Sequence, residues 1–324
     1  MTLTQIAIIT KRGIIAVIAL IFLSIVGAIG YRVWYDYYIS TLPPVEEKPD
    51  LKFGSLSKIV FPKTAVSSAN YSYSIDTETG SFPQMPKIIK VYFIPRANIV
   101  SLLAPDESQK LGVSFGFTLP REIVNPTNYK YADESNGSFN IDLTTGNFSY
   151  QKNIATSSAT LNKTFTDQSK LALDFKEFLK SRGKLNDDLA LGRTNVLYNK
   201  PIPSAAASAQ ISIWPSDFEG LEIVTPSFSL GLVQGNALNT EVPDRYSKVN
   251  YVYWQIDKNS FATYYLKPVD KAFAELPSGL GYVSSESPTS KVSIIKVTLA
   301  YFESEEYSPY LQPVYVFEGP NFKA

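Results

Sequence analysis

The most pronounced hydrophobic pattern lies near the amino terminus. Residues 13–31, GIIAVIALIFLSIVGAIGY, form an uninterrupted run of uncharged and mostly apolar residues. A helix of these nineteen positions, at a rise of 1.5 Å per residue, is about 28 Å long, which is close to the thickness of the hydrocarbon core of a bilayer. The run therefore predicts one membrane-spanning helix.

The residues that flank this run predict its orientation. Lys11 and Arg12 precede it, and Arg32 follows it within a cluster of aromatic residues, Tyr31, Trp34, Tyr35, Tyr37 and Tyr38. Basic residues favour the cytoplasmic side of a span, and tyrosine and tryptophan favour the interface. We expect residues 1–12 to be a cytoplasmic tail and residues 13–38 to be the transmembrane helix with its aromatic belt. The rest of the chain then lies outside the cytoplasm.

A cleaved signal peptide is the alternative interpretation, because Ala28 and Gly30 offer small residues at the spacing that a signal peptidase accepts. The apolar run is longer than a usual signal-peptide core, and its aromatic flank suits a helix that stays in the membrane, so we favour an uncleaved anchor. Ser24, Gly27 and Ala28 form a small-residue face that can admit a partner helix. Such small-residue pairs are common in single spans, so we favour ordinary lipid-facing sequence as their explanation.

Downstream of the span, the pattern changes from a spacer to alternating strands and short helices. Residues 39–50 contain Pro43, Pro44 and Pro49 between charged residues and predict a semi-rigid spacer. Helical spacing of apolar residues, with first-turn and stop signals, predicts helices within residues 98–113, 166–182 and 268–276. Between them lie strand-like runs, and residues 292–302 and 310–317 predict a final β-hairpin.

Two strings with the same order of residues raise the question of a ligand site. YSIDTETGSF spans residues 73–82, and FNIDLTTGNFSY spans residues 139–150. Gly80 and Gly146 supply the positive φ of a tight turn, while Asp76 and Asp142 can accept backbone N–H bonds. Neither string has the alternating oxygen ligands of a calcium loop, so we interpret both as structural turns of β-hairpins. A shorter relative at residues 254–265 predicts a third turn at Asn259 or Ser260.

These elements predict an α+β ectodomain, in which helices lie on one face of antiparallel sheets. Since a helix followed by strands recurs, we expect two modules, residues 51–153 and residues 154–324. Residues 201–245 fit no pattern that we can assign.

Composition restricts the chemistry. The 324 residues include no histidine and no cysteine, which excludes imidazole or thiolate metal sites, thiol nucleophiles and His-dependent triads. Lysine plus arginine and aspartate plus glutamate number 30 each, so there is no excess positive charge to attract nucleic acid. We expect no cofactor and no nucleic-acid partner.

A resemblance to a known family emerges from these elements. A short helix, a strand, a turn with Asp and Thr-Gly and a returning strand resembles the PepSY-type unit. The strings YYLKPVDKAFAELPSGLG and AYFESEEYSPYLQPVYVFEG, within residues 264–319, are similar to those of the YycI/YycH-type extracytoplasmic regulators of two-component histidine kinases. This resemblance implies two PepSY-like modules, no enzymatic activity and a membrane-anchored regulator that contacts a sensor histidine kinase.

Other functions draw on weaker signals. Ser55 and Lys58 have the S-x-x-K spacing of penicillin-recognising enzymes, but the remaining elements of those enzymes are missing. The carboxylate pairs Asp217 with Glu219 and Glu305 with Glu306 could act on glycosides, yet both lie in polar, loop-like sequence. We therefore expect a non-enzymatic interaction or regulatory protein of the cell membrane, with the bilayer and a membrane or envelope protein as partners. A structural component of a cell-surface assembly is the alternative, followed by a Ser/Lys envelope hydrolase.

Overall fold

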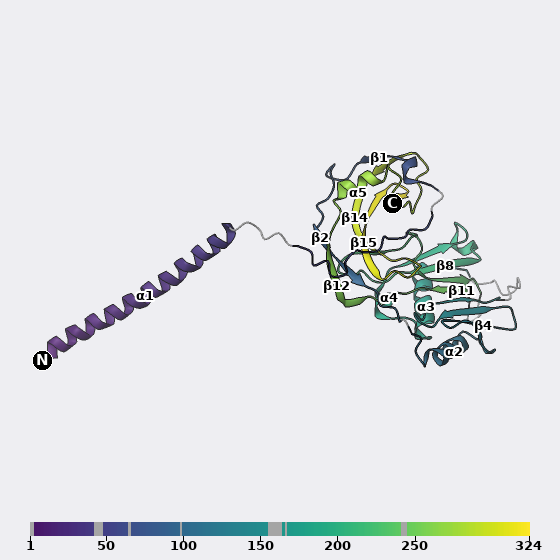
Figure 1. The fold of residues 1–324 in the computed structure, drawn as a ribbon, viewed down its shortest axis with the longest axis horizontal. Helices are drawn as coiled ribbons and strands as arrows, with labels where there is room; N and C mark the ends of the chain where they lie inside the picture. The colour runs from purple at the N-terminus through teal and green to yellow at the C-terminus, as the bar shows by residue number, and fades with distance from the viewer. Residues whose placement is uncertain are drawn as a thin grey trace. The chain divides into compact units, whose positions relative to one another are not determined.

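The structure, a computed structural model, describes residues 3–41, 48–63, 66–97, 99–154, 164–165, 167–240 and 245–324. It consists of two units, Met1–Lys48 and Pro49–Ala324 (Figure 1).

The first unit is one long helix, α1 (Leu3–Thr41). Its segment Ile15–Tyr38 is long and apolar enough to span a membrane, and its residues are exposed. The prediction of a single amino-terminal apolar helix is confirmed. Lys11 and Arg12 lie within the same helix, which starts well before the apolar run. Of the predicted spacer, residues 39–41 belong to α1, residues 42–47 lie outside the described residues, and residues 48–50 form neither helix nor strand.

The second unit contains two main sheets. The larger one is antiparallel and has eight strands in the order β3 (Glu122–Asn125), β4 (Asn128–Ala132), β5 (Ser138–Asp142), β6 (Phe148–Gln151), β11 (Tyr246–Tyr251), β10 (Val233–Leu238), β8 (Ser208–Ile213) and β7 (Thr194–Tyr198). The smaller sheet runs in the order β12 (Asp257–Tyr265), β2 (Ile88–Phe93), β15 (Tyr310–Gly319), β14 (Lys296–Phe302) and β9 (Ile223–Val224), with β16 (Phe322–Lys323) paired to β15.

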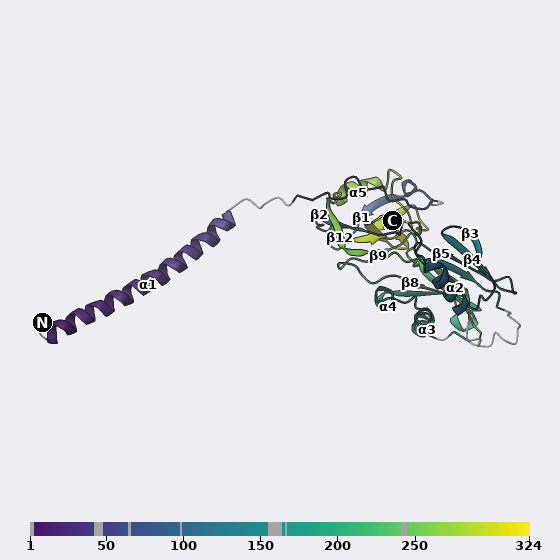
Figure 2. The ribbon, with the colours of Figure 1, turned by 60° about the horizontal axis from the view of Figure 1, so that its bottom comes forward.

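Helices cover one face of the eight-stranded sheet (Figures 1 and 2). They are α2 (Ala104–Ser114), α3 (Gln168–Lys180) and the short α4 (Asp187–Leu191). Phe115, Phe175 and Leu189 from the helical segments join the inward-facing strand residues in one buried cluster. Because the strands alternate, their other side chains point to the opposite face, which carries mainly polar residues. This arrangement confirms the α+β class.

Local signals explain where the helices begin and end. The Asp167 carboxylate accepts the Ser169 N–H as the N-cap of α3, and Gly183 follows this helix at a φ of +66°. Pro105 stands in the first turn of α2, and Pro268 immediately precedes α5 (Val269–Glu275). All three helices predicted from the sequence are therefore present.

A small two-stranded element completes the second unit. The strand β1 (Ser72–Ile75) pairs in parallel with β13 (Lys291–Ile294), and α5 packs beside them in a separate apolar cluster. Single turns of 3-10 helix lie at η1 (Ser68–Asn70) and η2 (Pro203–Ala205).

Strand pairing overturns the predicted boundary between residues 153 and 154. β6 lies before that boundary and β11 well after it, yet Ser149 is paired with Asn250 inside one continuous sheet. Likewise β2 pairs with β12 and β15, which are far away in the sequence. Backbone hydrogen bonds between distant strands have no local sequence signature. The repeated pattern of helix and strands therefore suggested two modules, whereas strands from both predicted modules form the same sheets.

Of the three turns predicted from the sequence, one forms the expected hairpin and two do not. The hairpin at Asp142 and Gly146 is confirmed, since β5 and β6 are antiparallel neighbours. The prediction of a hairpin at Asp76 and Gly80 is wrong. Gly80 does form a turn, at a φ of +67°, but β1 pairs with β13 and not with a strand that follows this turn. Proline lacks the N–H that a returning strand must donate, and Pro83 and Pro86 follow this turn. The third predicted turn is a bulge within β12.

Candidate functional site

A hollow with a mainly apolar lining lies on one face of the six-stranded sheet. We call it the apolar groove, and its volume is about 350 Å³. Ile89 and Val91 of β2, with Val314 and Val316 of β15, line its floor. Because side chains alternate along a strand, the neighbouring Tyr92 enters a different buried cluster on the opposite face. The groove side of the sheet and the Tyr92 side thus belong to different packing environments.

An extended segment of the chain, residues 50–61, borders this groove. It pairs with β12 at its start, where Leu51 N–H donates to Thr263 O at 3.2 Å and Thr263 N–H donates to the Asp50 carboxylate at 2.8 Å. This Thr263 N–H, above all, holds the pKa of Asp50 below its usual value. Further along, Gln312 Nε2 donates to Ser57 O at 2.9 Å. The segment is therefore fixed to two strands of the sheet.

Aromatic and aliphatic side chains hold the same segment on the sheet. The Phe53 ring stacks on Tyr310 with a centroid distance of 5.1 Å. The Phe61 ring stacks on Tyr282 at 5.0 Å and meets Phe302 edge-on at 4.8 Å. The sheet face thus already binds one extended stretch of chain through apolar side chains and a few hydrogen bonds.

Polar groups at the rim of the groove satisfy one another. The Lys267 ammonium group lies 2.7 Å from both carboxylate oxygens of Glu275, and the Ser284 hydroxyl donates to Pro226 O at 2.7 Å. Large apolar side chains nevertheless remain open at this rim, with Leu280 71% and Tyr265 65% exposed. Among the described side chains that line the groove, the charged ones, Lys267 and Glu275, neutralise each other, whereas an apolar side chain of a ligand would bury apolar surface there.

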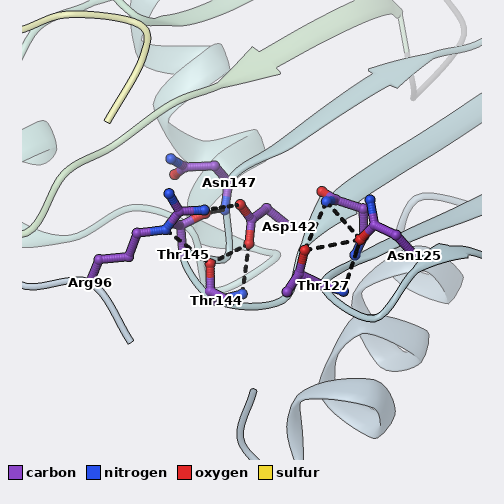
Figure 3. A network of polar contacts seen from close by, with 8 residues as sticks. Arg96, Asn125, Thr127, Asp142, Thr144, Thr145 and Asn147 are labelled. Carbon is purple, nitrogen blue, oxygen red and sulfur yellow. Dashed lines mark hydrogen bonds and ion pairs between the residues drawn. The ribbon is translucent and has the colours of Figure 1, made fainter. Parts of the chain in front are cut away.

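The Asp142 turn, which the sequence singled out, has a different role (Figure 3). Asp142 Oδ1 accepts hydrogen bonds from the Thr144 N–H at 2.7 Å and from the Thr144 hydroxyl at 2.6 Å, while Oδ2 lies 3.3 Å from Arg96 Nη2. Gly146, at a φ of +72°, donates its N–H to Asp142 O at 2.7 Å. Both carboxylate oxygens are engaged within the protein, which identifies Asp142 as a structural turn residue.

A second turn adjoins it and repeats the same chemistry. Asn125 Oδ1 accepts the Thr127 N–H at 2.9 Å and the Asn128 N–H at 2.8 Å. Leu143 N–H donates to Thr127 O at 2.7 Å and joins the two turns. Side chains at the ends of β3, β4, β5 and β6 therefore stabilise this corner of the sheet.

The other residues predicted from the sequence do not line the groove. The Asp76 carboxylate accepts the Ser293 hydroxyl at 3.2 Å and so supports the parallel pair of β1 and β13. In α1, the Ser24 hydroxyl donates to Leu20 O within the helix, and Gly27 and Ala28 are exposed.

The candidate catalytic residues also stay apart. Ser55 and Lys58 are exposed, and within the described part of the chain no hydrogen bond joins them. Glu219 is 3.3 Å from Lys90 Nζ, and Glu305 and Glu306 are exposed. In the same part of the chain, no group of three or more Asp or Glu residues could hold a metal ion.

Sequence reasoning missed both the groove and the role of residues 201–245. That stretch supplies β8, β9 and β10, and Thr225 and Phe228 form one wall of the groove. The spacing of Phe53, Ile59 and Phe61 was the only available signal for the segment that borders the groove.

Comparisons with known proteins identify no family. No family model matches the sequence, and no curated protein matches it. Among solved structures, an uncharacterized protein from Eubacterium rectale ATCC 33656 aligns with a TM-score of 0.41 and 11% identity, over 74% of this chain and 82% of that chain. A likeness at this level carries no argument about function.

Proposed function

We propose that this protein is anchored in the cell membrane by α1 and that its ectodomain binds an extended, apolar segment of a membrane or envelope protein in the apolar groove. The amino terminus is cytoplasmic and Pro49–Ala324 lies outside the cytoplasm in this proposal. One observation carries it: the same sheet face already holds an extended segment of its own chain and leaves about 350 Å³ of apolar space beside that segment.

Three features support a protein segment as the occupant. Phe53 and Phe61 show how a stretched chain can place rings on this sheet face. The lining of the groove is mostly aliphatic and aromatic, so that burial of two or three large apolar side chains would contribute about 1.5–3 kcal/mol each. Recognition of an extended segment through pockets that take its alternate side chains is a recurrent feature of peptide binding.

Anchoring by α1 would keep the ectodomain close to partners in the same membrane. The segment that borders the groove begins at Asp50, only a few residues after the end of α1 at Thr41. Tethering to a bilayer raises the local concentration of any partner in the same membrane, which lets a weak contact become effective. The proposed binding needs no catalytic group, in agreement with our expectation of a non-enzymatic protein.

The resemblance to YycI/YycH-type regulators suggests a sensor histidine kinase as the partner. The strings that carry it, within residues 264–319, include α5 and β15, which form part of the groove. In this proposal the ectodomain consists of PepSY-like modules and regulates the kinase. A surface assembly component is the second kind of partner, in which case the protein is structural.

The test is site-specific photo-crosslinking of the full chain in native membranes. A photoreactive residue at the Leu280 position should crosslink to a discrete partner, and peptide mapping should place the crosslink in an apolar segment. The same residue at Leu191, which is 81% exposed on α4 and does not line the groove, is the matched control. In competition with unlabelled protein, Leu280→Asp should fail to displace the partner, whereas Leu191→Asp and Ser55→Ala should displace it like the natural chain.

The outcome also separates the alternatives. A histidine kinase as the partner supports regulation, and a wall-synthesis or surface-assembly protein supports scaffolding. Equal crosslinking from both positions, or a crosslink that maps to a polar segment, would refute the groove as the binding site. Loss of the phenotype in Ser55→Ala at normal protein level would favour the hydrolase.

A further inference from the structure

The uncovered face of the eight-stranded sheet carries an unusual row of side chains. Strand pairing places them next to one another across seven strands, in the order Lys130, Asn140, Ser149, Asn250, Gln234, Ser212 and Asn195. A second row beside it contains Ser138, Gln151, Lys248, Asn236 and Gln210. Amides and hydroxyls dominate both rows, although charged residues are common on exposed sheet faces.

Part of this face is a hollow, which we call the polar groove. It has a volume of about 470 Å³. Its lining consists of Ser138, Asn140, Ser149, Tyr150, Gln151, Gln234, Lys248, Asn250 and, from the loop after β14, Glu305. Since neighbouring strands are about 4.8 Å apart, the four side chains from Asn140 to Gln234 cover about 14 Å. The groove can therefore contact an elongated ligand along its whole length.

The two ends of this row differ. Toward β7 the row closes beneath a loop, because Asn195 Nδ2 donates to Ser229 O at 2.9 Å and Gln234 Nε2 donates to Gly231 O at 2.6 Å. Ser212 is only 1% exposed there. Toward β4 the row is open, and Asn140 is exposed. The groove thus has a closed end and an open end.

The side chains at its centre have unused hydrogen-bonding capacity. Within the described residues, the side chains of Asn140, Ser149, Gln151 and Asn250 make no hydrogen bond to any protein group, although Ser149 and Asn250 are half-buried. Their neighbours outside the groove pair with each other instead: Asn236 Nδ2 donates to the Ser247 hydroxyl at 2.8 Å. Each free amide offers two donors and an acceptor, and the Ser149 hydroxyl can do both.

The charges of the side chains that line the polar groove indicate which class of ligand it can bind. Among the described residues that line the groove, Lys248 and Glu305 are the two that are charged at neutral pH, so their charges cancel. A polyanion or a polycation would meet a like charge together with a single counter-charge. An apolar ligand would cover amides without replacing their bonds to water, which is costly. A neutral molecule rich in hydroxyl groups matches the lining, because each of its hydroxyls can donate and accept.

We propose that the polar groove binds a neutral oligosaccharide, with Asn140, Ser149, Gln151 and Asn250 as the residues that hydrogen-bond its hydroxyl groups. Glu305 accepts further hydroxyl bonds from the loop side of the groove. A peptide is a poorer occupant of this groove, since Tyr150 is the one aromatic residue and no aliphatic residue is found among the described residues that line it, so apolar side chains of a peptide would find little apolar surface to cover. This site is separate from the apolar groove, and neither proposal depends on the other.

Calorimetry on the full chain in phosphatidylcholine nanodiscs tests this inference. Sugar-based detergents have to be avoided, because they could compete. The probes are three neutral hexasaccharides, namely cellohexaose, maltohexaose and N-acetylated chitohexaose, with an uncharged Gly/Ser hexapeptide as the comparison. At least one hexasaccharide should bind with a dissociation constant in the micromolar to low millimolar range, and the peptide should not bind.

Variants locate the binding. Asn140→Ala combined with Asn250→Ala should weaken the hexasaccharide at least tenfold, while Gln168→Ala, which removes an exposed amide at the start of α3, should leave it unchanged. Because an unfolded variant would also lose binding, the circular dichroism spectrum of each variant has to match that of the natural chain. If the double variant does not fold, the single variant Ser149→Ala replaces it in the binding measurement. Binding of none of the three hexasaccharides, binding of the peptide alone, or unchanged affinity in the folded variants would overturn the proposal. Leu280→Asp should not alter the affinity, which separates this test from that of the apolar groove.

Discussion

Glu303 makes the stability of the folded protein depend on pH, because its carboxyl group is buried and neither of its oxygens has a well-formed hydrogen bond. The residue follows β14 and is 2% exposed, and its N–H donates to Val224 O at 2.8 Å. Neither carboxylate oxygen has a hydrogen-bond partner of good geometry, although the Trp254 backbone N–H is close enough to lower the pKa a little. Burial is the larger influence and raises the pKa of Glu303 to about 8.

The raised pKa makes stability depend on pH in a defined direction. The ordinary pKa of 4.5 applies to the unfolded chain, so both states are protonated below that value and the site has no pH effect there. As the pH rises from 4.5 to about 8, the unfolded chain releases a proton that the folded protein retains. Each pH unit in this window lowers the free energy of unfolding by about 1.4 kcal/mol. The loss reaches about 3 kcal/mol at pH 7 and about 5 kcal/mol above pH 8.

Glu303→Gln keeps the shape of the side chain and removes the ionisation. We expect the variant and the natural protein to have similar stability at pH 4, and the variant to become more stable by up to about 3 kcal/mol at pH 7. Urea unfolding of the ectodomain unit Pro49–Ala324, followed by the fluorescence of Trp214 and Trp254, measures this difference at several pH values. Glu305→Gln, a change at an exposed carboxylate on the same loop, is the control and should have no such effect. A difference that is the same at pH 4 and pH 7, or a variant that is less stable at both, would refute the reasoning.

Two further predictions concern the turn and the anchor. Asp142→Ala removes two hydrogen bonds to Thr144 and the ion pair with Arg96, and should lower the free energy of unfolding by about 0.5–2 kcal/mol in urea titrations; loss of crosslinking from Leu280 in this folded variant would contradict a purely structural role. A reporter enzyme that works only outside the cytoplasm, fused after Ala324, should be active, since Lys11 and Arg12 favour a cytoplasmic amino terminus. Activity of a cytoplasm-specific reporter at the same position would reverse the topology.

Several elements could be predicted from the sequence because their physical causes are local. The apolar run of α1 is a property of consecutive residues, and its length alone indicates a possible span. Asp167 and Gly183 mark the ends of α3 through contacts within one turn of the helix. Asp142 and Gly146 close the hairpin of β5 and β6 through bonds within five residues. In each case the interacting groups are close neighbours along the chain.

The tertiary structure decided everything that depends on which distant strands become neighbours. Asp76 and Gly80 repeat the local signals of the Asp142 turn, yet β1 pairs with β13, more than 200 residues away, because the sheet register is set by long-range packing. Both grooves arise in the same way, since their linings come from strands and loops that are far apart in the sequence.

Glu303 shows most clearly that burial cannot be predicted from the neighbouring sequence. In the sequence it begins the polar run Glu303-Ser304-Glu305-Glu306 and looks like any residue of a solvated loop. In the folded protein Glu305 is exposed, while Glu303 is enclosed near Val224 and Trp254, which come from other parts of the chain. Burial depends on what the rest of the chain places around a side chain, and this surrounding is not encoded in the residues next to it.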